Sequence, residues 1–202
     1  MNIKQPFKQL QHFSDRLFYG IKQYHPKKRV VPDKMIEGHG TAWEGLEQII
    51  PDIIDQSGCG REKCLEFGVE FGYSAVALSN YFKKVTGVDI FTGDAHAGFH
   101  GDIYEKVKRD LEPFDNIRLI QSDYREFISG NNEYFDMIHI DIVHTYEATL
   151  ECGSWSACHS HCTIFHDTES FPDVKRAIRY IARKHGKTFY NYPYHFGLGI
   201  LY

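Results

Sequence analysis

The sequence predicts an α/β domain with a Rossmann-like, doubly wound sheet of about seven strands, most of them parallel. Short apolar runs typical of buried strands alternate with segments of helical periodicity, and this alternation favours parallel strands joined by right-handed crossovers. The last two strand-like runs are separated only by residues 193–196. Because so short a connection can join only antiparallel neighbours, we expect the chain to end in an antiparallel hairpin strand.

The elements follow in chain order. Residues 1–40 are polar, rich in aromatic side chains and broken by prolines and glycines, so we interpret them as an arm or lid on a domain of residues 41–202. Apolar positions at helical spacing predict a helix over 43–54. The expected strands are 63–67, 84–88, 117–120, 135–140, 162–166, 188–192 and 197–202, and the helices between them are 73–82, 102–111, 145–157 and 173–185.

The predicted arm carries Phe13, Phe18, Tyr19 and Tyr24. Such side chains indicate that the arm packs on something, either the mouth of the active site or a subunit interface. In the second case the protein would be a homo-oligomer.

Composition excludes several classes of protein. The formal net charge of −4 argues against a duplex-binding protein, and we interpret the basic run 25–29 as solvated surface. No run approaches the ~18 apolar residues that a membrane span needs, and the N-terminus lacks the apolar core of a signal peptide. Five irregularly spaced cysteines indicate free thiols. We expect a cytoplasmic protein with no membrane or nucleic-acid partner.

A glycine turn follows the first strand of the domain, with Gly68 and Gly72 between the strand and the next helix. Glycine lets a backbone approach a ligand closely, so a side chain at Gly68 should block a ligand while leaving the fold largely intact. The spacing does not fit the dinucleotide pattern G-x-G-x-x-G. Glu66, inside the strand, needs a donor for its carboxylate; the donor is either a cationic ligand group or an arginine of the chain.

Two further acids follow the next strands. Asp89 ends the second strand, where an acid about 20 residues after the glycine turn can bind both hydroxyls of a ribose. Asp123 follows the third strand and would face a base ring. With Glu66 these acids would line one crevice at the carboxyl ends of the strands, where open α/β sheets bind ligands.

Residues 66–74, followed by Gly87-Val88-Asp89, resemble the cofactor signature of class I S-adenosylmethionine-dependent methyltransferases. The chain is most similar to a branch that includes O-methyltransferases of natural-product sugars, and residues 135–147, 165–167 and 197–200 fit that branch. The resemblance covers residues 43–202. It implies that the turn from Glu66 to Gly72, with Ser74, holds the methionine part of S-adenosylmethionine, that Asp89 holds the ribose, and that Asp123 and Tyr124 hold the adenine.

Candidate catalytic residues follow the fourth and fifth strands: Asp141 and His144, then His166 and Asp167. Methyl transfer to a hydroxyl needs a base, or a metal that acidifies the hydroxyl. Acids at these two places hold Mg²⁺ in similar sugar O-methyltransferases, which implies Asp141 and Asp167 as metal ligands and His144 or His166 as base or third ligand. Some relatives have two acids where this chain has His166-Asp167. Alternatively, both aspartates cap the helices that follow them.

Three other features of the sequence have a structural interpretation that needs no ligand. Cys152, Cys158, His159, His161 and Cys162 are of types that suit zinc, but their spacing matches no closed tetrahedral pattern, so we interpret them as core cysteines and a surface loop. The basic side of the last helix (Lys175, Arg176, Arg179, Arg183 and Lys184) is interpreted as solvated. The loop 93–101, which contains His96, either lines the substrate pocket or is an ordinary surface loop.

These patterns predict an O-methyltransferase for a small hydroxylated metabolite or sugar, assisted by a divalent metal if the implied site is filled. Two alternatives stay open. One is an oxygenase of the same fold with iron held by His144, His166 and Asp167. The other is a cofactor-binding domain that serves a partner and has no chemistry of its own.

Overall fold

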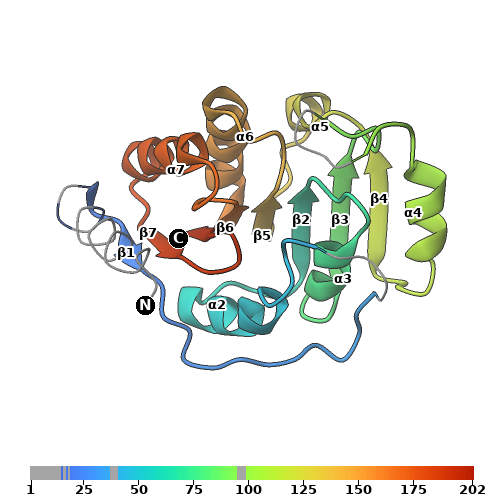
Figure 1. Ribbon diagram of the computed structural model, residues 1–202, viewed down its shortest axis with the longest axis horizontal. Coiled ribbons are helices and arrows are strands. Elements are labelled where there is room, and N and C mark those ends of the chain that lie inside the picture. Colours follow the sequence, from blue (N-terminus) through green and yellow to red (C-terminus); the bar gives the residue numbers. More distant parts are fainter. Residues whose placement is uncertain (1–14, 16, 18, 37–40, 95–98) are drawn as a thin grey trace, which may run out of the picture.

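The computed structural model describes residues 15, 17, 19–36, 41–94 and 99–202 (Figure 1). In these residues the chain forms one mixed sheet in the order β1-β7-β8-β6-β5-β2-β3-β4. The strands are β1 (Lys22–Gln23), β2 (Lys63–Phe67), β3 (Lys84–Asp89), β4 (Ile117–Gln121), β5 (Phe135–Ile140), β6 (Ser160–His166), β7 (Phe189–Tyr192) and β8 (Leu198–Leu201).

Helices cover both faces of the sheet (Figure 1). They are η1 (Glu47–Ile49), α2 (Ile50–Ser57), α3 (Tyr73–Ser79), α4 (Tyr104–Asp110), α5 (Tyr124–Gly130), α6 (Tyr146–His159) and α7 (Pro172–His185). Successive residues of β2 point to opposite faces, so that Cys64 packs with α2 and α3 whereas Leu65 packs with α6 and α7. Both faces of the central strands are therefore buried.

The chain adds strands first on one side of β2 and then on the other side, so the strand order reverses beside β2. From β2 the chain proceeds to β3 and β4 on one side, then crosses to β5 and β6 on the other. All these pairs are parallel, and Phe67 lies opposite both Val88 and Ile140. The carboxyl ends of β2, β3 and β5 therefore meet at the point where open α/β sheets bind ligands. The predicted fold class is confirmed, including the antiparallel strand β8, which lies between β6 and β7.

Two elements were not predicted. The helix α5 has seven residues, too few for an apolar period to stand out in a window of about 11–18 residues. It begins where the side chain of Asp123 accepts a hydrogen bond from the backbone N–H of Arg125. The strand β1 has two residues and adds to the edge strand β7 in parallel. Pairing this short depends on the neighbouring strand and leaves no pattern in the sequence.

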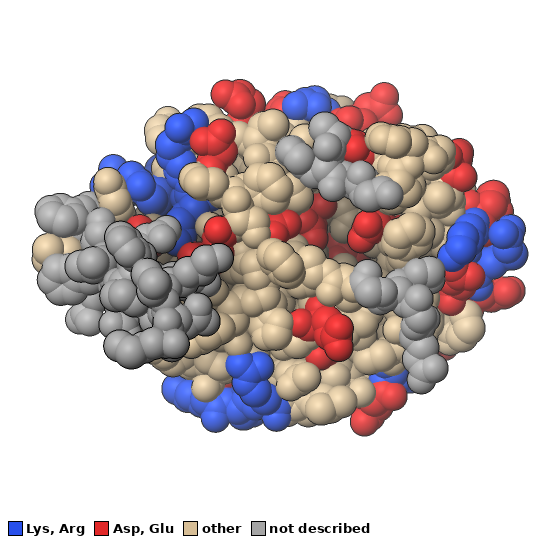
Figure 2. All heavy atoms as spheres, in the orientation of Figure 1, with Lys and Arg blue, Asp and Glu red and all other residues tan. Residues whose placement is uncertain are grey.

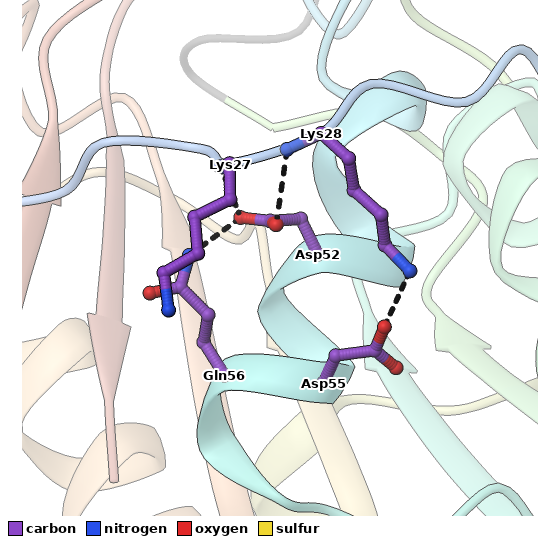
Figure 3. A pocket seen from close by; sticks show the side chains of 5 residues that line it. All are labelled: Lys27, Lys28, Asp52, Asp55 and Gln56. Carbon is purple, nitrogen blue, oxygen red and sulfur yellow. Dashed lines mark hydrogen bonds and ion pairs between the residues drawn. The ribbon is translucent and has the colours of Figure 1, made fainter.

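Residues 24–28 of the predicted arm are hydrogen-bonded to the domain at Asp52 (Figure 3). Tyr24 is only 2% exposed and belongs to the core. The carboxylate of Asp52 accepts hydrogen bonds from the hydroxyl of Tyr24 at 2.6 Å, from Gln56 Nε2 at 2.6 Å, and from the backbone N–H groups of Lys27 and Lys28 at 3.2 Å each. Phe13 and Phe18 lie outside the described residues, and the covering role of the arm stays a prediction.

A second attachment corrects the interpretation of the basic side of α7. Lys175 is 7% exposed rather than solvated. Its Nζ lies 3.0 Å from a carboxylate oxygen of Asp15 and 2.6 Å from one of Glu169. The guanidinium of Arg179 lies over the ring of Tyr19. The helix therefore binds the described part of residues 15–19 instead of facing water along its whole basic side.

The interpretation of Cys152, Cys158, His159, His161 and Cys162 as core cysteines and a surface loop is correct only in part, because His159 ends α6 and His161 lies in β6. Cys152 and Cys162 are fully buried, whereas Cys158 is exposed and its Sγ lies 3.3 Å from His185 Nδ1. His159 stacks on Trp155, and His161 Nε2 bonds the backbone oxygen of Ser57.

In the described part of the chain, no helix is long and apolar enough to cross a membrane.

Asp52 provides a test of the attachment of residues 24–28. Replacing Asp52 by Ala removes the common acceptor of four hydrogen bonds, and hydrogen bonds to charged groups contribute about 1.5–3 kcal/mol. We expect the free energy of unfolding in urea to fall by at least the value for one such bond, about 1.5–3 kcal/mol. The control is Asp55→Ala on the same helix, where exposed ion pairs with Lys28 and Arg61 should contribute less than about 1 kcal/mol. Equal losses in the two variants would contradict the special role of Asp52.

Candidate functional site

A cavity of about 450 Å³ opens at the carboxyl ends of β2, β3, β4, β5 and β6. This volume is typical of small-molecule sites, which measure about 300–1,000 Å³. Figure 2 shows acidic side chains around a hollow near the middle of this face of the molecule. The acids that line the cavity are Glu70, Asp89, Asp94, Asp123, Asp141 and Asp167.

The glycine turn forms one wall of the cavity, and its backbone fits against the end of β5. Gly68 and Gly72 have φ angles of 86° and 89°, which side chains rarely allow. A Cβ atom at Gly68 would lie 1.9 Å from the carbonyl oxygen of Asp141. The expectation that a side chain at Gly68 would spare the fold is therefore wrong, because that side chain would collide with the chain's own backbone before it met any ligand.

Asp89 connects the glycine turn to the end of β3. Its Oδ2 accepts hydrogen bonds from the backbone N–H groups of Val69 at 2.7 Å and Glu70 at 2.9 Å. Its Oδ1 accepts one from Phe91 N–H at 2.7 Å. A carboxylate has about four acceptor positions, so an oxygen that faces the cavity can still accept from a ligand hydroxyl. Asp89 therefore shapes the wall that it lines.

The residues that were expected to face an adenine ring lie at the start of α5. Asp123 caps this helix through the backbone N–H of Arg125 at 2.7 Å. Tyr124 donates its hydroxyl to Glu151 at 2.9 Å, and burial together with this bond raises the pKa of Tyr124. The guanidinium of Arg125 lies 4.6 Å from the centre of the Tyr124 ring. Both expected residues line the cavity, as does Ser74 on α3.

Glu66 lies outside the lining of the cavity. Its side chain is fully buried, and Oε1 lies 2.8 Å from Nδ1 of His139 on the neighbouring strand. The indole N–H of Trp43 donates to His139 Nε2 at 3.1 Å. The partner is thus neither a ligand group nor an arginine, the two expected donors. Among the described residues Glu66 Oε2 has no hydrogen-bond partner.

Sequence reasoning missed His139 and Trp43. Trp43 lines the cavity, so the three buried side chains connect the cavity wall to the sheet. A signal was present, since His139 interrupts the apolar run 137–140 and a buried imidazole needs a partner.

Four side chains form what we call the Asp–His cluster: Asp141, His144, His166 and Asp167. His144 Nε2 lies 3.2 Å from Asp141 Oδ1 and 3.0 Å from Asp167 Oδ2. His166 Nδ1 lies 3.0 Å from Asp141 Oδ2 and 3.5 Å from Asp167 Oδ2. The structure brings together all four residues that the sequence placed after the fourth and fifth strands.

The alternative that the two aspartates cap helices is wrong. The N-cap of α6 is Thr145, whose hydroxyl accepts from Ala148 N–H, and the N-cap of α7 is Phe171. Asp167 instead has a φ of 64°, a conformation that is costly for most residues and typical of functional sites. His144 stacks on Phe171 with ring centres 4.3 Å apart. The carboxylates therefore point into the site.

The electrostatics of the cluster differ from those of two bare carboxylates. Burial lowers the pKa of His144, but hydrogen bonds and charges of Asp141 and Asp167 outweigh it and raise the pKa to about 9. The pKa of His166 is likewise raised against burial by Asp141. Burial raises the pKa of Asp141, but His166 and His144 hold it well below its usual range. The two imidazoles and the two carboxylates of the cluster therefore stabilise the charged forms of one another.

The same atoms fit a divalent metal. One ligand atom each from Asp141, His144 and Asp167 lie within 4.8 Å of one another, the only such group of three among the described residues. Gly93, Asp94 and Phe99 of the loop 93–101 also line the cavity, whereas His96 lies outside the described residues.

Comparisons with known proteins agree with this architecture. The model of a family described as a methyltransferase domain matches residues 65–168, about half of the chain. A curated relative, the uncharacterised protein y4gI of Sinorhizobium fredii, is 28% identical over 153 residues, which are 69% of this chain but 17% of the relative. The chain therefore spans about one sixth of the length of the curated relative that it matches.

Solved structures share the fold at low identity. The O-methyltransferase NovP has a TM-score of 0.61 at 15% identity, covering 78% of this chain and 77% of that one. SAM-bound CalS10, an amino pentose methyltransferase from Micromonospora echinaspora, has a TM-score of 0.60 at 11% identity, with coverages of 80% and 92%. The O-methyltransferase from Bacillus cereus in complex with SAH has a TM-score of 0.55 at 15% identity, with coverages of 82% and 84%.

The family match, the strand order and the position of the cavity therefore lead to one assignment: the chain belongs to the methyltransferase-domain family and has the Rossmann-like fold of S-adenosylmethionine-dependent methyltransferases.

Proposed function

We propose that the chain transfers a methyl group from S-adenosylmethionine to a hydroxyl of a small metabolite, with sugars as the first acceptors to test. The observation that carries this proposal is that one cavity is lined both by the glycine turn with Asp89 and by the Asp–His cluster. The first set suits binding of the cofactor, and the second suits removal of a proton from the acceptor. Cofactor and acceptor could therefore meet within one site.

The cofactor side of the cavity fits a nucleoside with an amino-acid tail. Asp89 would accept hydrogen bonds from the ribose hydroxyls, and Asp123 and Tyr124 would lie beside the adenine. The turn at Gly68–Gly72, with Ser74, would hold the methionine part. Glu66 lies behind this turn and outside the cavity lining. Its carboxylate would attract the cationic part of the ligand electrostatically, without touching it.

The acceptor side has to orient a hydroxyl and manage its proton. S-adenosylmethionine supplies the methyl group on a positively charged sulfur. Asp141 and His144 would bind the acceptor hydroxyl, and a positioned side chain that removes its proton accelerates the transfer. Because the pKa of His144 is raised to about 9, His144 would act as that base in its deprotonated form, which alkaline pH favours. A divalent ion held by Asp141, Asp167 and His166 would lower the pKa of a bound hydroxyl; Mg²⁺ is the ion that the resemblance to sugar O-methyltransferases implies.

The two alternative functions stay testable. The family match favours methyl transfer over oxygenation, and a non-catalytic domain has no evident use for a cluster of two carboxylates and two imidazoles. Release of S-adenosylhomocysteine during a screen of hydroxylated acceptors would support the enzyme. Binding of S-adenosylmethionine with no turnover on any acceptor class would favour the non-catalytic domain.

Asp89 tests the cofactor side. Replacing Asp89 by Asn keeps the size of the side chain but removes its charge and one acceptor oxygen. We expect binding of S-adenosylmethionine, measured by titration calorimetry, to weaken by about 1.5–3 kcal/mol, the range for hydrogen bonds to charged groups. Because Asp89 also shapes the turn, circular dichroism should first establish that the variant folds. Glu70→Gln changes a charge on the same wall and should have a much smaller effect; unchanged affinity in Asp89→Asn would reject the ribose assignment.

Asp141 tests the acceptor side. We expect Asp141→Asn to lower methyl transfer about 100-fold or more, since general-base contributions are about 10²–10⁴-fold, while affinity for S-adenosylmethionine stays near that of the unaltered chain. The measurements are S-adenosylhomocysteine release and calorimetry on the same preparation. Asp173→Asn, at an exposed carboxylate of α7, is the matched control. Full turnover in Asp141→Asn would remove Asp141 from the chemistry.

A further inference from the structure

We propose that the Asp–His cluster binds a first-row transition-metal dication in preference to Mg²⁺, with the imidazoles of His144 and His166 as ligands beside the two carboxylates. The inference deepens the proposed function, because such an ion would sit where the acceptor hydroxyl is expected. Metal binding is nevertheless measured without cofactor or acceptor, so the two proposals can fail separately.

The geometry of the cluster brings one ligand atom each of Asp141, His144 and Asp167 within 4.8 Å of one another, and the ring of His166 adjoins both carboxylates of this group. Each of the two imidazole nitrogens contacts both carboxylates, at 3.0–3.2 Å for His144 Nε2 and at 3.0–3.5 Å for His166 Nδ1. The nitrogens and oxygens therefore face one another at hydrogen-bond distance. A cation could replace the shared protons and contact the same atoms.

The chemistry of these donors decides which cation fits. Mg²⁺ prefers oxygen ligands and is usually bound by one or two carboxylates, with several waters retained. Imidazole suits iron, zinc, nickel and copper, and a set of two histidines and one carboxylate with open positions is typical of Fe²⁺. Two nitrogens in a cluster of four residues therefore favour a transition metal over Mg²⁺.

The surroundings of His166 keep its Nδ1 directed at the carboxylates. Its Nε2 lies 3.2 Å from the backbone carbonyl oxygen of His195. Because a carbonyl oxygen only accepts, Nε2 carries a hydrogen, which leaves Nδ1 as the metal-binding nitrogen of the neutral ring. A histidine that ligates a metal commonly donates its other N–H in this way.

The loop that supplies this carbonyl is itself held in place. His195 and Phe196 have φ angles of 52° and 64°, and the carbonyl of Phe196 accepts from the backbone N–H of Glu169 at 2.8 Å. Since His195 lies between β7 and β8, and Glu169 lies two residues after Asp167, the hairpin and the ligand segment constrain each other. Such support around ligand residues affects metal affinity strongly.

The first experiment measures metal selectivity directly. The 202-residue chain, stripped with a chelator, is titrated by calorimetry with MnCl₂, CoCl₂, ZnCl₂ and MgCl₂, each alone. We expect one Co²⁺ or Zn²⁺ per chain, bound about tenfold or more tightly than Mg²⁺, following the preference of imidazole ligands. Equal or tighter binding of Mg²⁺, or the absence of any metal binding, would overturn the proposal.

Two variants test the role of the imidazoles. His166→Asp exchanges a nitrogen for oxygens, so binding of Co²⁺ should weaken by about 10–100-fold, as changes around metal ligands do, and the preference for Co²⁺ over Mg²⁺ should shrink or invert. His161→Asn, on the surface and bonded to the backbone of Ser57, is the control and should bind metal as the unaltered chain does. Unchanged selectivity in His166→Asp would overturn the proposal.

A spectroscopic measurement on the unaltered chain keeps the test independent of how the variants fold. Pulsed electron paramagnetic resonance of the Mn²⁺-loaded chain should show coupling to imidazole nitrogen. A spectrum without nitrogen coupling would overturn the assignment of His144 and His166 as ligands. Metal binding with nitrogen coupling but no methyl transfer to any acceptor would support this inference and count against the proposed function alone.

Discussion

The site depends on the close contact between two backbones, the turn after β2 and the first residue after β5. Gly68 lies so near the carbonyl of Asp141 that a Cβ atom would be 1.9 Å from that oxygen, and Asp141 N–H bonds the carbonyl of Phe67 at 2.8 Å. This contact lies where the strand order reverses. The contact fixes the distance between the wall that is expected to hold the cofactor and the cluster that is expected to bind the acceptor. In-line transfer of a methyl group requires that distance to be constant.

The sequence predicted those features that rest on local patterns or on strand ends. The seven main strands are all present, and β2 and β5 have the expected bounds. Asp141 and Asp167 converge because both follow parallel neighbouring strands, a property that topology alone provides. What a local pattern cannot give is a contact between residues of different strands. The pair of Glu66 and His139 depends on the register of β2 against β5, and the alternatives considered for Glu66 did not include a neighbour on the sheet.

Side-chain roles were predicted less well than positions, for the same physical reason. An acid at the end of a strand can face a ligand or bond to nearby backbone N–H groups, and Asp89 and Asp123 bond backbone while also lining the cavity. Lys175 belongs to a basic run that suggested a solvated face, yet two acids from distant segments enclose it. Charge patterns along a helix indicate exposure only until another segment packs there.

The position of β8 has a consequence for how the protein forms as it is made. This strand comes after all others in the chain but lies inside the sheet, between β6 and β7. Strands β6 and β7 therefore have no common neighbour until residues 198–201 have left the ribosome, and the His195 carbonyl cannot reach His166 before that hairpin closes. Segments that must wait for distant partners fold late and are prone to aggregation while they wait. A nascent chain would therefore hold an assembled glycine turn well before it held a complete Asp–His cluster.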